Sequence, residues 1–73
     1  MVTIDQAVEK AREFLTRKVG LANWFLYLEE LKLEEGRWKL KFRYEPLIDR
    51  ERFYLVEVDD VKGDVINFMK TQS

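Results

Sequence analysis

The sequence predicts an α+β fold in which one N-terminal helix packs on a four-stranded antiparallel meander sheet, in the order α-β-β-β-β. Apolar residues follow the helical period before Gly20, whereas after Asn23 they alternate with the period of two that strands have. Turn-forming residues interrupt the strand-like part at 34–36, 46–51 and 60–63. Because the chain has only 73 residues, it is predicted to form a single helix-plus-sheet domain, 1–73.

The first predicted element is a helix from about residue 3 to residue 19. Thr3 and Gln6 have the spacing of a capping box, in which each side chain bonds to the other residue's backbone amide. An apolar stripe follows at helical spacing: Ile4, Ala7, Val8, Ala11 and Leu15. Gly20 suits the left-handed residue that ends many helices, so the helix is expected to stop there.

The clearest strand is 37–45, in which large apolar residues alternate with charged ones without exception. The apolar set is Trp38, Leu40, Phe42 and Tyr44. Such alternation indicates an antiparallel sheet with one buried face and one face in water. The buried face is predicted to pack against the helix residues Val8, Ala11 and Leu15.

The preceding strand, 24–34, changes phase in its middle. Strict alternation would place Glu29 on the apolar face, where an unpaired carboxylate is costly. A β-bulge at Glu29 and Glu30 removes this conflict. It keeps five apolar residues on the inner face, namely Trp24, Leu26, Leu28, Leu31 and Leu33. The two remaining strands are predicted at 52–59 and 64–70.

Composition limits the range of functions. The net charge of −1, from 13 basic and 14 acidic residues, gives no general attraction to nucleic acid or acidic lipid. No stretch of about 18 apolar residues exists, and the start of the sequence has no basic lead, so neither a membrane span nor a signal peptide is predicted. With no Cys as well, the expected location is the cytoplasm. The high share of charged residues, with few Asn and Gln, is typical of thermophilic proteins.

The chain lacks the residues that most enzymes use. It has no His for acid–base catalysis and no Cys for nucleophilic attack, and its three Gly are scattered rather than gathered in a phosphate loop. Asp59, Asp60 and Asp64 surround Gly63, but tight turns favour the same residues, and a calcium loop needs more ligands. The prediction is a non-enzyme without catalytic residues, cofactor or metal.

Both ends of the sequence resemble a PepSY-type domain. Residues 54–66 contain a Tyr-x-Val-x-Val-Asp strand, a turn that ends at Gly63 and a short strand opening with Asp64, as that family does. Residues 3–8, Thr-Ile-Asp-Gln-Ala-Val, are similar to the start of the family's helix. The resemblance implies a cystatin-like helix on an antiparallel sheet and a non-catalytic binding or inhibitory module. The family has no catalytic residues to transfer, and its exported or membrane-linked context differs from that expected for a chain in which no signal peptide is predicted.

The outer face of the predicted sheet carries aromatic residues interleaved with cations. The residues predicted to bind a partner there are Phe25, Tyr27, Lys39, Lys41, Arg43, Phe53 and Leu55. Aromatic side chains and Arg are enriched in protein interfaces, but aromatics beside cations also bind single-stranded nucleic acid. A third interpretation is ordinary surface, where Lys and Arg stems cover the aromatics and pair with Glu30, Glu34 or Glu57.

We expect a non-enzymatic protein-interaction module. It would bind a protein partner, or a second copy of itself in a homodimer, through the outer face or through an edge strand such as 64–70. The alternative is a small single-stranded nucleic-acid-binding protein that uses the same outer face, although the overall charge gives it little long-range help. No membrane partner is predicted.

Overall fold

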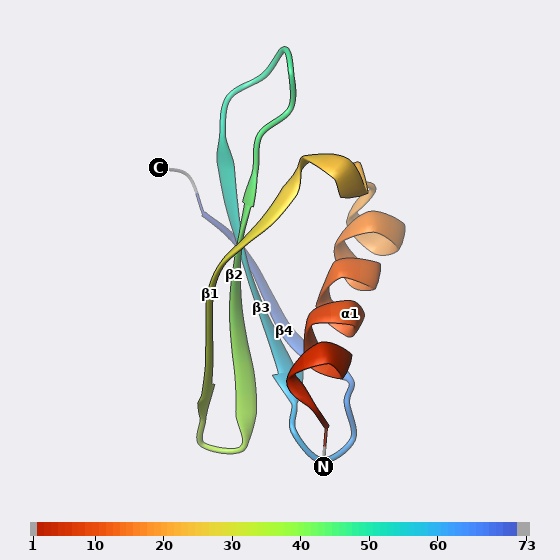
Figure 1. Ribbon diagram of the computed structural model, residues 1–73, viewed down its shortest axis with the longest axis vertical. Helices are drawn as coiled ribbons and strands as arrows, with labels where there is room; N and C mark the ends of the chain where they lie inside the picture. The colour runs from red at the N-terminus through yellow and green to blue at the C-terminus, as the bar shows by residue number, and fades with distance from the viewer. Residues whose placement is uncertain (1, 72–73) are drawn as a thin grey trace.

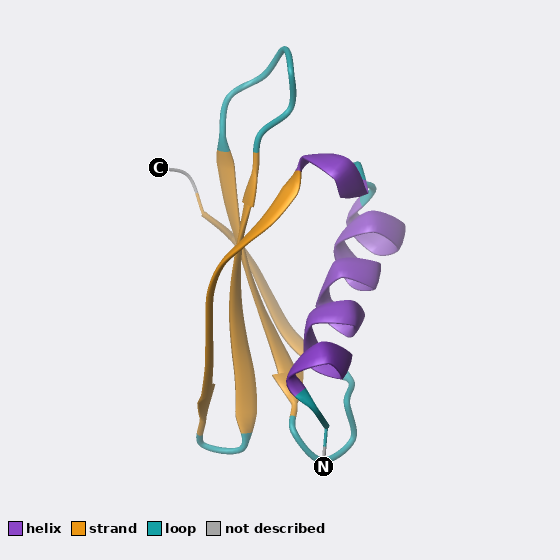
Figure 2. Ribbon diagram, in the orientation of Figure 1, coloured by secondary structure: helices purple, strands orange, loops and turns teal. Residues whose placement is uncertain are grey.

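A four-stranded antiparallel sheet with a helix on one of its faces is formed by residues 2–71, the part of the chain that the computed structural model describes. The strands follow one another in the order β1-β2-β3-β4, and the helix α1 lies on one side of them (Figures 1 and 2). The elements are α1 (Ile4–Phe14), β1 (Leu26–Glu34), β2 (Arg37–Tyr44), β3 (Arg52–Asp59) and β4 (Val65–Thr71). The α+β meander predicted from the sequence is therefore confirmed.

The start and the end of the helix are the ones that the sequence indicates. The Thr3 hydroxyl accepts a hydrogen bond from the Gln6 amide at 3.2 Å, and the Gln6 side chain accepts one from the Thr3 amide at 3.0 Å. After Phe14 the chain continues as one wider π-helical turn, η1 (Leu15–Val19), and stops at Gly20, whose φ is 89°. The amides of Gly20 and Leu21 both donate to the Leu15 carbonyl, which accounts for the wider turn.

The prediction that a strand begins at Trp24 is wrong by two residues. A short 3-10 turn, η2 (Asn23–Phe25), connects the helical end to β1. Trp24, expected on the inner face, is 74% exposed instead. The chain has to turn here from the helix onto the sheet, and the turn is held by a hydrogen bond from the Ala22 amide to the Tyr44 hydroxyl at 3.3 Å.

The β-bulge predicted in β1 is confirmed. Leu28 lies opposite Phe42 and Glu30 lies opposite Lys41, so that Glu29 is the extra residue of the bulge. Because directly opposite residues point to the same side of a sheet, Leu28 shares the helix-side face with Phe42. The bulge therefore allows the leucines on both sides of it to share one face.

The core lies between α1 and the middle of the sheet. Its buried members are Ala11, Leu15, Leu26, Leu40, Phe42, Tyr54, Val56 and Val58. Trp38, expected in the same layer, is half-buried at the edge of this cluster. The helix packs mainly on β2, β3 and β4, so the helix-side face of β1 is left partly open.

The described residues hold no helix that is both long and apolar enough to cross a membrane.

The hairpin between β1 and β2 is closed by two residues with positive φ, Glu35 at 53° and Gly36 at 74°. Two successive positive φ values are the signature of the tight hairpin turn that matches the twist of its strands. The turn sets the register of β1 on β2, in which Glu34 lies opposite Arg37 and Lys32 lies opposite Lys39.

Candidate interaction surfaces

Six of the seven predicted partner-binding residues come together on the face of the sheet opposite α1, called the outer face here. Cross-strand pairing places Tyr27, Arg43 and Phe53 in one row, and Lys41 beside Leu55 in the next. Lys39 follows in a third row, opposite Glu57. The alternation of the strands accounts for this arrangement, since all of these positions share one parity around the bulge.

Phe25 does not join this group, and its predicted place on the outer face is wrong. It belongs to η2 rather than to a strand. Its ring lies edge-on to those of Trp24, at 5.9 Å between centroids, and Tyr44, at 6.3 Å. Tyr44 lies opposite Leu26 of the core and therefore belongs to the helix-side face. Phe25 consequently packs at the end of the helix-side layer.

Of the three cations predicted to bind a partner, Lys39 and Lys41 are engaged at their ammonium groups. The Lys39 Nζ lies 2.7 Å from a carboxylate oxygen of Glu34. The Lys41 Nζ lies 4.8 Å from the centroid of the Phe53 ring, a cation–π contact that also covers the aromatic face. The Lys39–Glu34 ion pair lies at the solvent-accessible surface, where such a pair contributes little to stability. The two contacts nevertheless occupy the groups that a phosphate would need.

Arg43 is held by two carboxylates and an aromatic ring. Its Nε lies 3.2 Å from Glu29 and 3.1 Å from Glu45, and its guanidinium lies 5.5 Å from the Tyr27 centroid. The Nε–H is not aligned for a hydrogen bond with either carboxylate, so the attraction is coulombic. The outer face thus matches, at these contacts, the interpretation in which cations cover the aromatics and pair with neighbouring carboxylates.

The contact between Lys39 and Glu34 gives a testable titration. The hydrogen bond from Lys39, together with the charges of Lys39 and Lys32, lowers the pKa of Glu34 below its ordinary value of 4.5. A depressed pKa means that the pair favours the folded state at neutral pH, and that this contribution is lost as the pH falls through the lowered value. In Lys39→Met the Glu34 pKa is expected to rise, as measured by a carboxyl-carbon NMR titration. The control Lys62→Met should leave it unchanged, and an unchanged pKa in Lys39→Met would mean that the contact does not persist in solution.

The other candidate surface is the free edge of β1. Leu28 and Leu33 point to the helix side but remain 36% and 47% exposed, with half-buried Leu31 between them. Sequence reasoning predicted the direction of these side chains correctly but missed their exposure. Dimensions alone would have indicated it, because a helix about 10 Å wide covers only two or three strands spaced about 4.8 Å apart.

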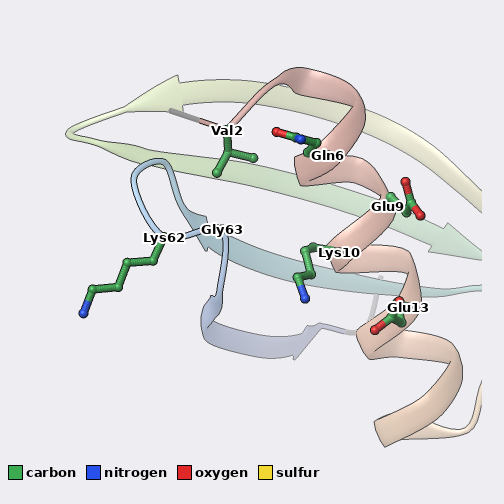
Figure 3. Close-up of a pocket in the computed structure, with 7 residues that line it drawn as sticks. All are labelled: Val2, Gln6, Glu9, Lys10, Glu13, Lys62 and Gly63. Atoms are coloured by element: carbon green, nitrogen blue, oxygen red, sulfur yellow. The ribbon is translucent and has the colours of Figure 1, made fainter.

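A third feature is an open groove between α1 and the turn that joins β3 to β4. Its lining residues are Val2, Gln6, Glu9, Lys10, Glu13, Lys62 and Gly63. Figure 3 shows the Lys62 side chain pointing away from the helix that carries Glu9 and Glu13. Across residues 2–71, no three side chains of the metal-binding types gather closely enough to hold an ion.

Comparison with known proteins adds no relative: no protein-family model, no curated protein and no solved structure matches the chain. The resemblance to PepSY-type domains stays a prediction that rests on the two terminal segments of the sequence. Any functional conclusion has to come from the two sheet surfaces, the outer face and the free edge of β1.

Proposed function

We propose that this chain is a non-enzymatic protein-interaction module that binds an extended protein segment along the free edge of β1. The observation that supports it most is that β1, nine residues long, pairs only with β2 within the described chain, while Leu28 and Leu33 stay exposed beside the free edge. An added strand would satisfy backbone groups by main-chain hydrogen bonds and would cover alternate side chains. The cytoplasmic location expected from composition belongs to the same proposal.

Two further features support binding of this kind. Tyr27 stands on the outer face of the same strand and is exposed, so an added strand would meet apolar surface on both sides of β1. The predicted PepSY-type resemblance also implies a non-catalytic binding module. The other outer-face residues would then flank the site without forming its centre.

The alternative, binding of single-stranded nucleic acid, draws on Tyr27 and Phe53 lying beside Lys41 and Arg43. A bound strand would stack its bases on the rings and would place its phosphates near the cations. Those cations already contact Phe53, Tyr27, Glu29 and Glu45, and such contacts would have to be exchanged. The net charge of −1 adds little attraction at longer range.

A peptide-display selection on the immobilised full chain tests the proposal. We expect the selected peptides to alternate apolar and polar residues and to keep their binding at high salt. Leu33→Glu should weaken that binding by about tenfold or more, because it removes buried apolar area at the edge. The control Ile48→Glu, the same change in the exposed loop between β2 and β3, should have no effect.

The alternative is tested in parallel with a single-stranded oligonucleotide. Binding that falls steeply with salt and is lost in Lys41→Glu would replace the proposal with nucleic-acid binding. Peptide binding that is indifferent to Leu33→Glu would also contradict the proposed site.

A further inference from the structure

We propose that the segment bound along β1 is the same strand of a second copy of this chain. The two strands would run antiparallel with Leu31 opposite Leu31, which gives one continuous eight-stranded sheet. The inference rests on the proposed function and names its occupant. A two-fold axis through the strand pair makes the interface self-complementary. Each side chain of β1 must therefore meet a complementary β1 side chain of the second copy, which runs in the opposite direction. Both faces of β1 meet this requirement.

On the outer face, Glu30 and Lys32 are the groups that match. Lys32 lies directly opposite Lys39, a like charge, and Glu30 lies opposite Lys41, whose ammonium is turned toward Phe53. Neither Glu30 nor Lys32 belongs to any of the ion pairs formed within residues 2–71. With Leu31 at the axis, Glu30 of each copy faces Lys32 of the other. Two symmetric ion pairs then form, and each Lys32 gains an anion beside it.

On the helix-side face, the exposed leucines match one another. Glu29 is the extra residue of the bulge, so Leu28 takes the position two places from Leu31 on one side, as Leu33 does on the other. In the proposed pairing, Leu28 of one copy lies opposite Leu33 of the other, and this contact occurs twice. The exposed apolar side chains beside the edge would then be covered by their own equivalents.

Other registers match less well. Moving the axis to Glu30 places two carboxylates opposite each other, and moving it to Lys32 does the same with two ammonium groups. An axis at Leu33 would use Glu34, which is already hydrogen-bonded to Lys39, and would leave Leu28 outside the overlap. The other edge strand, β4, carries Lys70 as its single charged residue and has no such reciprocal pair.

Cysteine cross-linking tests the register directly. The chain has no Cys, so each introduced thiol is unique. Directly opposite residues have Cα atoms about 4.5–5.5 Å apart, within the range of a disulfide. Mild oxidation should therefore convert Leu31→Cys to a covalent dimer of twice the 8.9 kDa chain mass. Leu33→Cys, which faces Leu28 of the second copy, should link poorly, and so should Ile66→Cys on β4.

A charge-exchange series tests the two proposed ion pairs. Glu30 and Lys32 are both exposed, so their substitution is not expected to prevent folding. Glu30→Lys and Lys32→Glu should each weaken the dimer about tenfold in sedimentation equilibrium, since each turns two attractions into two repulsions. The double variant Glu30→Lys/Lys32→Glu should recover the dimer, and mixing the two single variants should yield a heterodimer. Glu51→Lys and Lys62→Glu make the same charge changes elsewhere and should leave association unchanged.

The outcomes distinguish the proposed β1–β1 dimer from the proposed function, protein binding along the edge of β1. A chain that stays monomeric at high concentration, or that cross-links through Ile66→Cys rather than Leu31→Cys, would overturn the inference. Peptide binding that depends on Leu33 would then still support an interaction module at β1. Single charge variants that dimerise like the unchanged chain would also overturn the proposed register, whichever residues hold the dimer together.

Discussion

Replacing Phe42 with alanine is expected to lower the free energy of unfolding by about 3–5 kcal/mol. The Phe42 side chain has no exposed surface and belongs to the core cluster with Ala11 and Leu15 of the helical segment. The Arg12 guanidinium also lies 5.7 Å from its ring centroid. Truncation would remove the contacts that the Phe42 side chain makes in this cluster and would leave a cavity in a small core, where such a loss is a large share of the total stability.

Urea unfolding followed by circular dichroism measures this change. Leu47→Ala is the matched control, because Leu47 is an apolar residue in an exposed loop and its truncation should change stability by less than about 0.5 kcal/mol. A loss below about 1 kcal/mol in Phe42→Ala would mean that β2 presents its other face to the helix in solution. The outer-face positions Lys41 and Arg43 would then have to be buried, which their charges oppose.

The sequence predicts the fold correctly at features that depend on residues close to one another in the chain. The capping box at Thr3 and Gln6 needs only local spacing, and the alternation of β2 needs only one buried face. The bulge at Glu29 followed from the cost of burying a carboxylate. Each of these patterns has a local physical cause, and the structure contains each feature at the predicted residues.

The sequence could not show features that depend on how whole elements are placed. The turn η2 arises because the chain crosses from the helix end to the sheet, a geometry that no short pattern around Trp24 and Phe25 encodes. The exposure of Leu28 and Leu33 depends on which strands the helix covers. The outer-face cluster follows from the alternation of single strands, so the sequence predicts all of its residues except Phe25 correctly. The exposed leucines at the free edge of β1 depend on where the helix lies, so the sequence does not indicate that site.

Asp60 is another residue whose role depends on distant contacts. The sequence predicts a tight turn at Asp60, and turn residues are usually exposed, but Asp60 is only 8% exposed. Its carboxylate accepts a hydrogen bond from the Trp38 indole at 3.0 Å. Its amide donates to the Gly36 carbonyl at 3.1 Å, and its carbonyl accepts from the Val2 amide at 2.7 Å. Asp60 therefore joins the β1–β2 hairpin, the turn after β3 and the start of the chain.

Asp60→Ala is expected to lower the free energy of unfolding by about 1–3 kcal/mol, because the Trp38 N–H loses a charged acceptor in a half-buried place. Asp60→Asn keeps an acceptor and should recover most of this loss. Urea unfolding measures both variants in a Trp24→Phe background, where Trp38 is the single tryptophan and its emission should shift only in Asp60→Ala. Asp64→Ala, an exposed aspartate close by, is the control. If Asp60→Ala is as stable as that control, the carboxylate is solvated in solution and does not connect the turn to the hairpin.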